Sequence, residues 1–458
     1  MRRRALLPLL VLLAASCSGS YEAGPSSPAP PSPATSSAAS SPGSANVADW
    51  PTYHGDAARS GRSTDFPSAG QPHLLKSIQL DGAVYASPVA ASGVIVAATE
   101  NDSVYGFDTS GRQLWRMHLG EPSPAPERPC GNIDPLGITG TPVISGDSVY
   151  LVAEFARPVR HELFALDLRS GNVRWHRSVD LPGRDATAMQ QRGALSVAGG
   201  RVWVTFGGLA GDCGDYVGRL IGVPLDGAGS LVHYDVPTAR EAGMWTPPGP
   251  VVDAAGHLLV ATGNGASVPG DAYDHSDSVL ELDTAARLID SYSPAAWARE
   301  NAGDVDLGSV GPALVGDRWI VQGGKSSTVR VLRQGHLGGI GGEVSAQDIC
   351  RVFGGTAVDG DVVYLPCTDG VRAVSVDESG GLHVQWHAAS SIAGSPVIGG
   401  GRVWALDQEA GVLQALNPAT GRSSGQVQVG VTSRFATPAL YAGLVLVPTF
   451  AGLAFVRP

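Results

Sequence analysis

Charge is scarce in this sequence, and lysine is almost missing. Charged residues make up 16% of the 458 residues, and lysine occurs only at Lys76 and Lys325. Long surface helices would need more Glu, Lys and Leu, so the composition argues against a mainly helical fold. The formal net charge of −11 argues against a nucleic acid or another polyanion as partner, because neutralising phosphates requires a basic surface.

Glycine and proline are abundant instead, with 61 and 33 residues respectively. That mixture is typical of many short strands joined by tight turns. A chain of 458 residues could form two or three domains, or one large repeat architecture.

The first 17 residues have the pattern of a secretory signal. Arg2, Arg3 and Arg4 are basic, and residues 5–15 are apolar but too few to span a membrane, which takes about twenty residues. The run Leu-Ala-Ala-Ser-Cys that ends at Cys17 resembles a bacterial lipobox, although alanine stands where leucine is usual before the cysteine. We therefore expect residues 1–17 to hold a lipoprotein signal with lipid attached at Cys17. Plain secretion with cleavage nearby is the alternative.

Residues 18–48 form a tract of Ser, Pro, Ala and Gly with almost no charge. Such a segment buries too little apolar surface to offset the entropy lost on ordering, so we expect it to be disordered. It would hold the remaining domain, residues 49–458, away from the bilayer as a flexible tether. The sequence thus predicts a protein on the extracytoplasmic face of the cell membrane, attached to it only through the lipid.

The rest of the chain is built from internal repeats. A small residue followed by proline or an apolar residue recurs before a turn and a hydrophobic strand. The second residue of this pair stands at positions 88, 142, 195, 250, 312, 356, 396 and 438. The intervals run from 40 residues (356 to 396) to 62 residues (250 to 312), which is the spacing of units with four short strands.

Several units also contain a tight turn followed by a strand that carries tryptophan. Asp108 precedes Trp115 in the first unit, Asp167 precedes Trp175 in the second, and Trp386 ends the sixth. In these turns the aspartate caps backbone N–H groups, and a glycine three or four residues later adopts positive φ. We expect each tryptophan to pack between neighbouring sheets.

The last unit supplies only three strands, near residues 436–440, 444–450 and 453–456. A fourth strand is available at the other end of the domain, in residues 73–80, and its pairing there would remove exposed sheet edges. The sequence therefore predicts an all-β fold. It is an eight-bladed β-propeller of four-stranded antiparallel blades, in which the N-terminal strand closes the last blade.

The segment Asp-Trp-Pro-Thr-Tyr-His-Gly-Asp at residues 49–56, together with the Ala-Leu-Asp-x-x-x-Gly-x-x-x-Trp repeats, resembles the PQQ-like (pyrroloquinoline quinone repeat) β-propeller family. The resemblance covers about residue 49 to the C-terminus and is specific for the fold. The family includes quinone-dependent dehydrogenases as well as cofactor-free scaffolds and binding proteins, so the resemblance alone assigns no activity.

Residues 244–283 are similar to a stretch of the PQQ-dependent alcohol dehydrogenases. That resemblance implies that Trp245 stacks under the quinone ring and that Asn264, in a Gly-Asn-Gly turn, helps to ligate a calcium ion. It also implies that Lys325 contacts the quinone carbonyls.

The acidic loop Gly-Asp-Val-Asp-Leu-Gly is similar to the loop that carries the catalytic base in those dehydrogenases, which would make Asp304 or Asp306 the base. Asp306 and Glu154 would join Asn264 as the oxygen ligands that calcium prefers. The same residues also suit a cofactor-free protein. Gly-Asn-Gly is a common turn, the two aspartates could solvate a loop, and Lys325 could pair with one of them.

Cysteine usage separates these alternatives only in part. The sequence has no Cys-Cys pair for the vicinal disulfide of the dehydrogenases and no Cys-x-x-Cys-His haem motif. Apart from Cys17, four cysteines remain, an even number suited to an oxidising compartment, and three pairings are possible. Cys350 and Cys367 share a blade and a face, which favours their pairing and leaves Cys130 for Cys213. Metal binding is the alternative, but no Cys-x-x-Cys spacing supports it.

The sequence favours a non-catalytic, monomeric propeller without a cofactor that binds an extracytoplasmic protein, glycan or small ligand. The alternative is a PQQ- and calcium-dependent dehydrogenase of alcohols or sugars. An outer-membrane assembly scaffold shares the fold and the anchor, but the long Ser/Pro tether is more typical of a single-membrane envelope. Repeats one to four are the longest, so we expect their loops to form the working surface.

Overall fold

The computed structural model describes residues 48–458, which lie in the second of two compact units, Asn46–Pro458. The expected signal, the lipobox residue Cys17 and residues 18–47 of the expected tether lie outside the described residues. No helix of the described part is long and apolar enough to cross a membrane.

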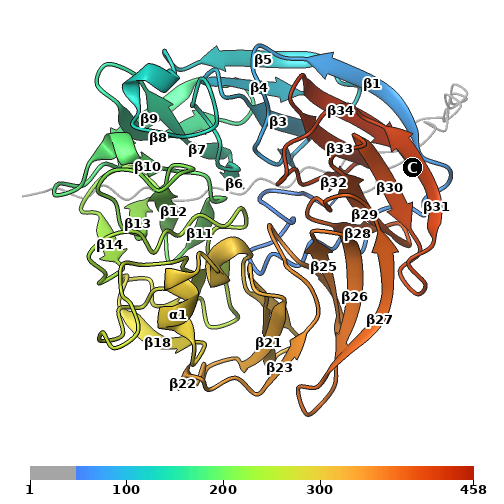
Figure 1. Cartoon of the computed structure of the whole chain (residues 1–458). Coiled ribbons are helices and arrows are strands. Elements are labelled where there is room, and N and C mark those ends of the chain that lie inside the picture. The colour runs from blue at the N-terminus through green and yellow to red at the C-terminus, as the bar shows by residue number, and fades with distance from the viewer. Residues whose placement is uncertain (1–47) are drawn as a thin grey trace, which may run out of the picture. The chain divides into compact units, whose positions relative to one another are not determined.

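Within residues 48–458, eight small sheets surround a central axis, so the chain is an eight-bladed β-propeller, as predicted (Figure 1). In blades 1 to 7 the main antiparallel strands follow one another along the chain from the axis outward, whereas the outermost strand of blade 8 comes from the N-terminal end of the domain. Blades 3 and 4 each gain a short fifth strand, and β22 in blade 4 runs parallel to its neighbour.

Blade 1 contains β2 (Val89–Ala91), β3 (Val94–Ala98), β4 (Ser103–Phe107) and β5 (Gln113–His118), and blade 2 contains β6 (Val143–Ser145), β7 (Ser148–Phe155), β8 (Arg160–Asp167) and β9 (Val173–Ser178). Blade 3 contains β10 (Met189–Gln190), β11 (Ser196–Ala198), β12 (Arg201–Gly208), β13 (Arg219–Pro224) and β14 (Val232–Asp235). Blade 4 contains β15 (Val251–Val252), β16 (Leu258–Ala261), β17 (Val279–Leu282), β18 (Leu288–Ser293) and β22 (Gly339–Ile340).

Blade 5 contains β19 (Ala313–Val315), β20 (Trp319–Gln322), β21 (Thr328–Arg333) and β23 (Ser345–Asp348), and blade 6 contains β24 (Ala357–Asp359), β25 (Val362–Cys367), β26 (Gly370–Val376) and β27 (Leu382–Ala389). Blade 7 contains β28 (Val397–Gly399), β29 (Arg402–Asp407), β30 (Val412–Leu416) and β31 (Ser423–Gln428). Blade 8 contains β32 (Ala439–Tyr441), β33 (Leu444–Thr449), β34 (Gly452–Arg457) and β1 (His73–Gln79). Helical segments are short: α1 (Trp297–Ala302) and the 3-10 turns η1 (Ala125–Glu127), η2 (Ala186–Ala188) and η3 (Leu307–Ser309).

The two ends of the domain share blade 8. Strand β1 pairs antiparallel with β34, from His73 opposite Arg457 to Gln79 opposite Gly452. In Figure 1 the blue strand β1 lies beside the red strand β34 at the rim of the ring. The predicted closure by the N-terminal strand is therefore confirmed.

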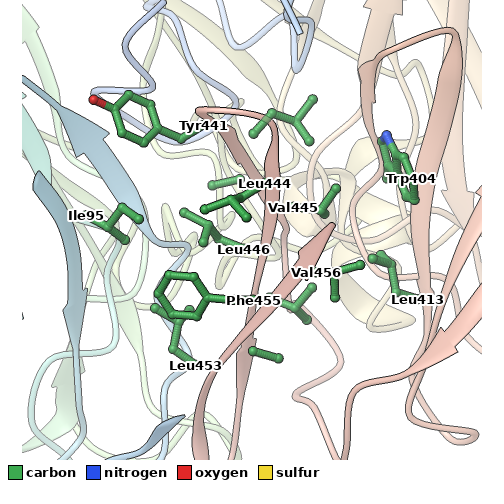
Figure 2. Packing of buried hydrophobic residues seen from close by; sticks show 14 of the residues in the cluster. Ile95, Trp404, Leu413, Tyr441, Leu444, Val445, Leu446, Leu453, Phe455 and Val456 are labelled. Atoms are coloured by element: carbon green, nitrogen blue, oxygen red, sulfur yellow. The ribbon is translucent and has the colours of Figure 1, made fainter. Parts of the chain in front are cut away.

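Apolar side chains fill the spaces between adjacent blades. Figure 2 shows this where blades 7, 8 and 1 meet: Phe455 and Leu446 of blade 8 lie between Ile95 of blade 1 and Trp404 of blade 7, all at 2% exposure or less. Burying one such side chain contributes about 1.5–3 kcal/mol, so each blade is held mainly by its neighbours.

The turns with aspartate and glycine join one blade to the next. Trp115 of blade 1 donates a hydrogen bond through Nε1 to the Leu168 carbonyl of blade 2, 3.0 Å away. Its ring lies against Gly171, where an added Cβ would fall 2.4 Å from a ring atom, and Trp386 lies against Gly421 of blade 7 in the same way. The prediction that these tryptophans pack between sheets is confirmed.

A strap of residues 49–66 runs along the inner strands. Hydrogen bonds join Trp50 to β2, and the carbonyls of Ala57, Ser60 and Gly61 accept from inner strands of blades 4, 6 and 7. The buried Arg59 reaches blade 3, where its Nη2 donates to a carbonyl at 2.9 Å. The strap therefore gives partners to backbone groups that would otherwise face the channel.

The four cysteines pair as the sequence favoured. Cys350 is joined to Cys367, and Cys130 is joined to Cys213. The second bond ties the loop that precedes blade 2 to the loop that follows β12 in blade 3.

We predict that Gly171→Ala destabilises the protein more than Gly146→Ala does. Both glycines have positive φ, +72° and +58°, so each alanine is strained by about 1–2 kcal/mol. A Cβ at Gly171 would also overlap the Trp115 ring, whereas a Cβ at Gly146 meets nothing within 4 Å. Overpacking at Gly171 therefore lowers the free energy of unfolding by a further amount of about 1–3 kcal/mol. Equal losses in urea unfolding would contradict the proposed docking of the tryptophan.

Candidate functional site

Loops of several blades form a cavity of about 420 Å³. Its lining comes from two kinds of segment: loops between the second and third strands of a blade, and links from one blade's outer strand to the next blade's inner strand. Blades 3 to 5 and the links between them supply most of the lining. The links that precede blades 6 and 8 contribute as well.

The predicted cofactor and catalytic residues meet in this cavity. Trp245 comes from the link before blade 4, and Asn264 from the loop after β16. Asp304 and Asp306 stand on the link before blade 5, and Lys325 follows β20. The structure thus brings these five side chains to one place.

Lys325 holds the two aspartates together. Its Nζ lies 2.6 Å from Asp304 Oδ1 and also pairs with Asp306 Oδ2. Asn264 donates from its Nδ2 to Asp304 Oδ1 at 2.9 Å and from its backbone N–H to Asp306 Oδ1 at 2.7 Å. Burial lowers the pKa of Lys325, but the carboxylates outweigh it and the pKa is raised. The lysine is therefore a fixed cation between two acids.

Glu154 does not join this group. It lies in β7, is 3% exposed, and is held by His161, whose Nε2 is 3.2 Å from Glu154 Oε2 and whose other nitrogen bonds Asp180. The three oxygen ligands assigned to calcium, Asn264, Asp306 and Glu154, are thus not assembled. Because an ammonium group already occupies the aspartates, the residues present do not fit the implied calcium ion.

Two arginines that the sequence did not single out also line the cavity. The Arg192 guanidinium lies over the rings of Phe435 and Trp245, 4.9 and 5.8 Å from their centres. The Arg434 guanidinium lies 3.8 Å from the centre of the Phe353 ring. Burial lowers the pKa of both arginines.

A signal in the repeats could have located these residues. Arg192, Phe353 and Phe435 each stand three residues before one of the recurring small-residue markers. The corresponding residues of units 1, 2 and 4 are Tyr85, Thr139 and Pro247, which line a narrow space of about 20 Å³ together with Arg192 and Phe435. The position three before the marker therefore faces the axis in these blades.

A group of buried acids lies between blades 1 and 2, apart from the cavity lining. Burial, with nearby Glu100 and Glu154, raises the pKa of Asp102 to about 9, and burial raises the pKa of Glu100 to about 7. Neither carboxyl oxygen of Asp102 has a hydrogen-bond partner within residues 48–458. Asp102 is therefore protonated at neutral pH.

We predict that Asp102→Asn stabilises the protein increasingly as pH rises from about 4 to about 9. The unfolded carboxyl ionises near pH 3.9 whereas the folded one keeps its proton to about pH 9, so wild-type stability falls through that window. Asparagine abolishes this loss, with a gain on the order of a few kcal/mol at pH 9.

Asp108→Asn is the matched control for that experiment. Hydrogen bonds from Ser110 lower the pKa of Asp108 to about 2, so its effect on stability stays constant above pH 5. Parallel curves of melting temperature against pH for wild type and Asp102→Asn would contradict a buried neutral carboxyl.

Comparisons with known proteins agree with the architecture. Residues 73–209 and 319–457 match the family model described as outer membrane protein assembly factor BamB. No curated protein matches the sequence.

Similar solved structures include quinohemoprotein alcohol dehydrogenase from Comamonas testosteroni, with a TM-score of 0.65 and 17% identity over 89% of this chain and 80% of that chain. BamB from Moraxella catarrhalis has a TM-score of 0.56 and 17% identity over 84% and 97%. A europium-containing methanol dehydrogenase has a TM-score of 0.65 and 12% identity over 89% and 98%. Such identities show a shared fold alone.

The stretch between the two matched segments, residues 210–318, carries much of the cavity. Trp245, Asn264, Asp304 and Asp306 all fall within it. The family match therefore covers the scaffold better than the site.

Proposed function

The chain belongs to the family of PQQ-like repeat β-propellers described as outer membrane protein assembly factor BamB, and on that premise we propose that it is a non-catalytic binding protein that takes a small polar ligand in its axial cavity. A rigid ring with a concave, loop-lined opening is suited to this use.

The observation that carries the proposal is a set of polar atoms on the cavity-lining side chains that lack a protein partner. Within residues 48–458, Asn264 Oδ1 is buried and accepts no hydrogen bond, and Arg434 Nε is buried and donates none. Leaving a buried polar group unsatisfied costs about 1–3 kcal/mol. A ligand that pairs with such groups would recover this energy.

The absence of catalysis is proposed from the charge arrangement. A catalytic base must have a carboxylate free to accept a proton, but Asp304 and Asp306 both face the ammonium group of Lys325. Glu154, the third expected calcium ligand, is bonded to His161 instead.

The alternative is a PQQ- and calcium-dependent dehydrogenase of alcohols or sugars. One observation favours it: Trp245, Asn264, Asp304, Asp306 and Lys325 line a single cavity. The quinone would supply the redox chemistry, and these residues would position it.

We predict that a thermal-shift screen of the full chain with small polar metabolites yields a ligand whose stabilisation is lost in Trp245→Ala. A ligand at a hundred times its Kd adds about 2.7 kcal/mol, and removing the ring opens one wall of the cavity. Phe450→Ala is the control, since Phe450 is 38% exposed and lies outside the lining.

Two results would contradict the proposal. The first is a screen in which no ligand responds to Trp245→Ala. The second is stoichiometric binding of PQQ with calcium, accompanied by reduction of a dye by an alcohol or sugar, which would favour the dehydrogenase instead.

We further propose that the protein is a lipoprotein, anchored through Cys17 on the extracytoplasmic face of the cell membrane. The basic, apolar and lipobox segments of residues 1–17 support this, and two disulfides suit an oxidising compartment. Its partner would be an extracytoplasmic protein, glycan or small ligand. The family's description also suggests an assembly scaffold, whose partner would bind the outer surface.

We predict that Cys17→Ala moves the protein from the membrane fraction to the soluble fraction and abolishes its labelling by radioactive palmitate. Substitution of Ser18, the next residue, by alanine is the control and leaves both unchanged. Retention of Cys17→Ala in the membrane fraction would contradict a lipid anchor at this position.

A further inference from the structure

Two cations on the cavity lining are not neutralised by a protein carboxylate. Lys325 pairs with two aspartates, whereas Arg192 and Arg434 make no ion pair and no side-chain hydrogen bond within residues 48–458. Glu100 acts on Arg192 from a distance, but burial raises the pKa of Glu100 to about 7, so this acid is only partly ionised at neutral pH. Among the described residues, the guanidinium groups of Arg192 and Arg434 thus have no carboxylate in direct contact.

The aromatic rings decide how these cations are presented. Phe353 lies under Arg434, and Phe435 lies under Arg192. A ring takes the flat face of a guanidinium and leaves its N–H edge free, and that edge matches a carboxylate with two parallel hydrogen bonds. Both arginines line the same cavity, and Phe435, the residue after Arg434, contacts Arg192 there.

Other residues of the lining carry hydrogen-bond acceptors. Asp212 accepts a hydrogen bond from Tyr216 at 2.6 Å, and Glu241 pairs with Arg240 at 2.7 Å, so both retain oxygen lone pairs. Asn264 Oδ1 is buried without a donor. A ligand that is anionic at both ends would place negative charge against these oxygens, whereas hydroxyl or amino groups would satisfy them.

We infer that the cavity binds a small organic acid whose carboxylate lies at Arg192 and Arg434 and whose other end carries hydroxyl or amino groups. This inference rests on the proposed binding function and names the class of its ligand. A hydroxylated six-membered ring with one carboxylate meets both requirements, and its C–H faces suit the rings of Trp245 and Phe435.

The test is calorimetric titration of the full chain with four probes: D-glucuronate, D-glucose, citrate and L-glutamine. D-glucose has the same ring without the carboxylate, citrate has three carboxylates, and L-glutamine has one carboxylate together with an ammonium group and a carboxamide. We expect D-glucuronate or L-glutamine to bind roughly 10- to 100-fold more tightly than D-glucose and citrate, which is the effect of one or two charge-assisted hydrogen bonds.

Substitutions of the two arginines test where the carboxylate of the bound acid lies. Arg192→Gln and Arg434→Gln should each weaken the bound acid roughly tenfold or more, and Arg434→Lys should restore only part of the loss because lysine lacks the two-pronged edge. Arg333→Gln is the matched control: its guanidinium lies 5.1 Å from the centre of the Trp319 ring but outside the cavity lining. The wild-type comparison of D-glucuronate with D-glucose needs no variant, so a folding defect in one variant leaves the test intact.

The outcomes separate the inference from the function beneath it. Equal binding of D-glucose and D-glucuronate, tighter binding of citrate, or no binding of either D-glucuronate or L-glutamine overturns the inference. In that case the proposed binding function still stands if the metabolite screen yields a ligand whose stabilisation of the protein is lost in Trp245→Ala. If the inference is overturned and no ligand from the screen responds to Trp245→Ala, the proposed binding function is overturned as well.

Discussion

The inner strands of the eight sheets would leave a row of unpaired backbone groups around the axis, and the strap of residues 49–66 satisfies many of them. The strap bonds to blades that are far apart around the ring, so it fixes their spacing from within, while β1 fixes it from the rim by completing blade 8. Tyr53 of the strap also borders the narrow space beneath the cavity, next to Arg192 and Phe435. The segment that completes the fold therefore also forms part of the floor of the site.

A rigid ring allows side chains from separate blades to be held at fixed positions. In the cavity this rigidity fixes the positions of the charged side chains. Lys325 forms ion pairs with Asp304 and Asp306, whereas Arg192 and Arg434 lie against aromatic rings and remain available to a ligand. A calcium-bound quinone would need acids to hold the metal or remove a proton, and here Asp304 and Asp306 both pair with Lys325.

The family relationship and the site fall on different parts of the chain. The BamB-type match covers residues 73–209 and 319–457, and the similar solved structures include both an assembly factor and dehydrogenases. Repeats are maintained by packing between blades, which depends on strand pattern and turn chemistry alone. Loops at the channel mouth are free of that constraint, so proteins with one scaffold can differ in what the cavity binds.

The eight blades, the closure by β1 and the packing of Trp115 and Trp386 could be predicted from the amino-acid sequence, because alternating strands, Asp–Gly turns and repeat spacing are local patterns. Trp245, Asn264, Asp304, Asp306 and Lys325 were candidates from the sequence as well, since the segments that carry them resemble those of the PQQ-dependent alcohol dehydrogenases. The hydrogen bond between Glu154 and His161, and the contact of Arg192 with the distant Phe435, could be seen only once the chain was folded. Contacts across a ring depend on which blades face each other, and no local pattern records that.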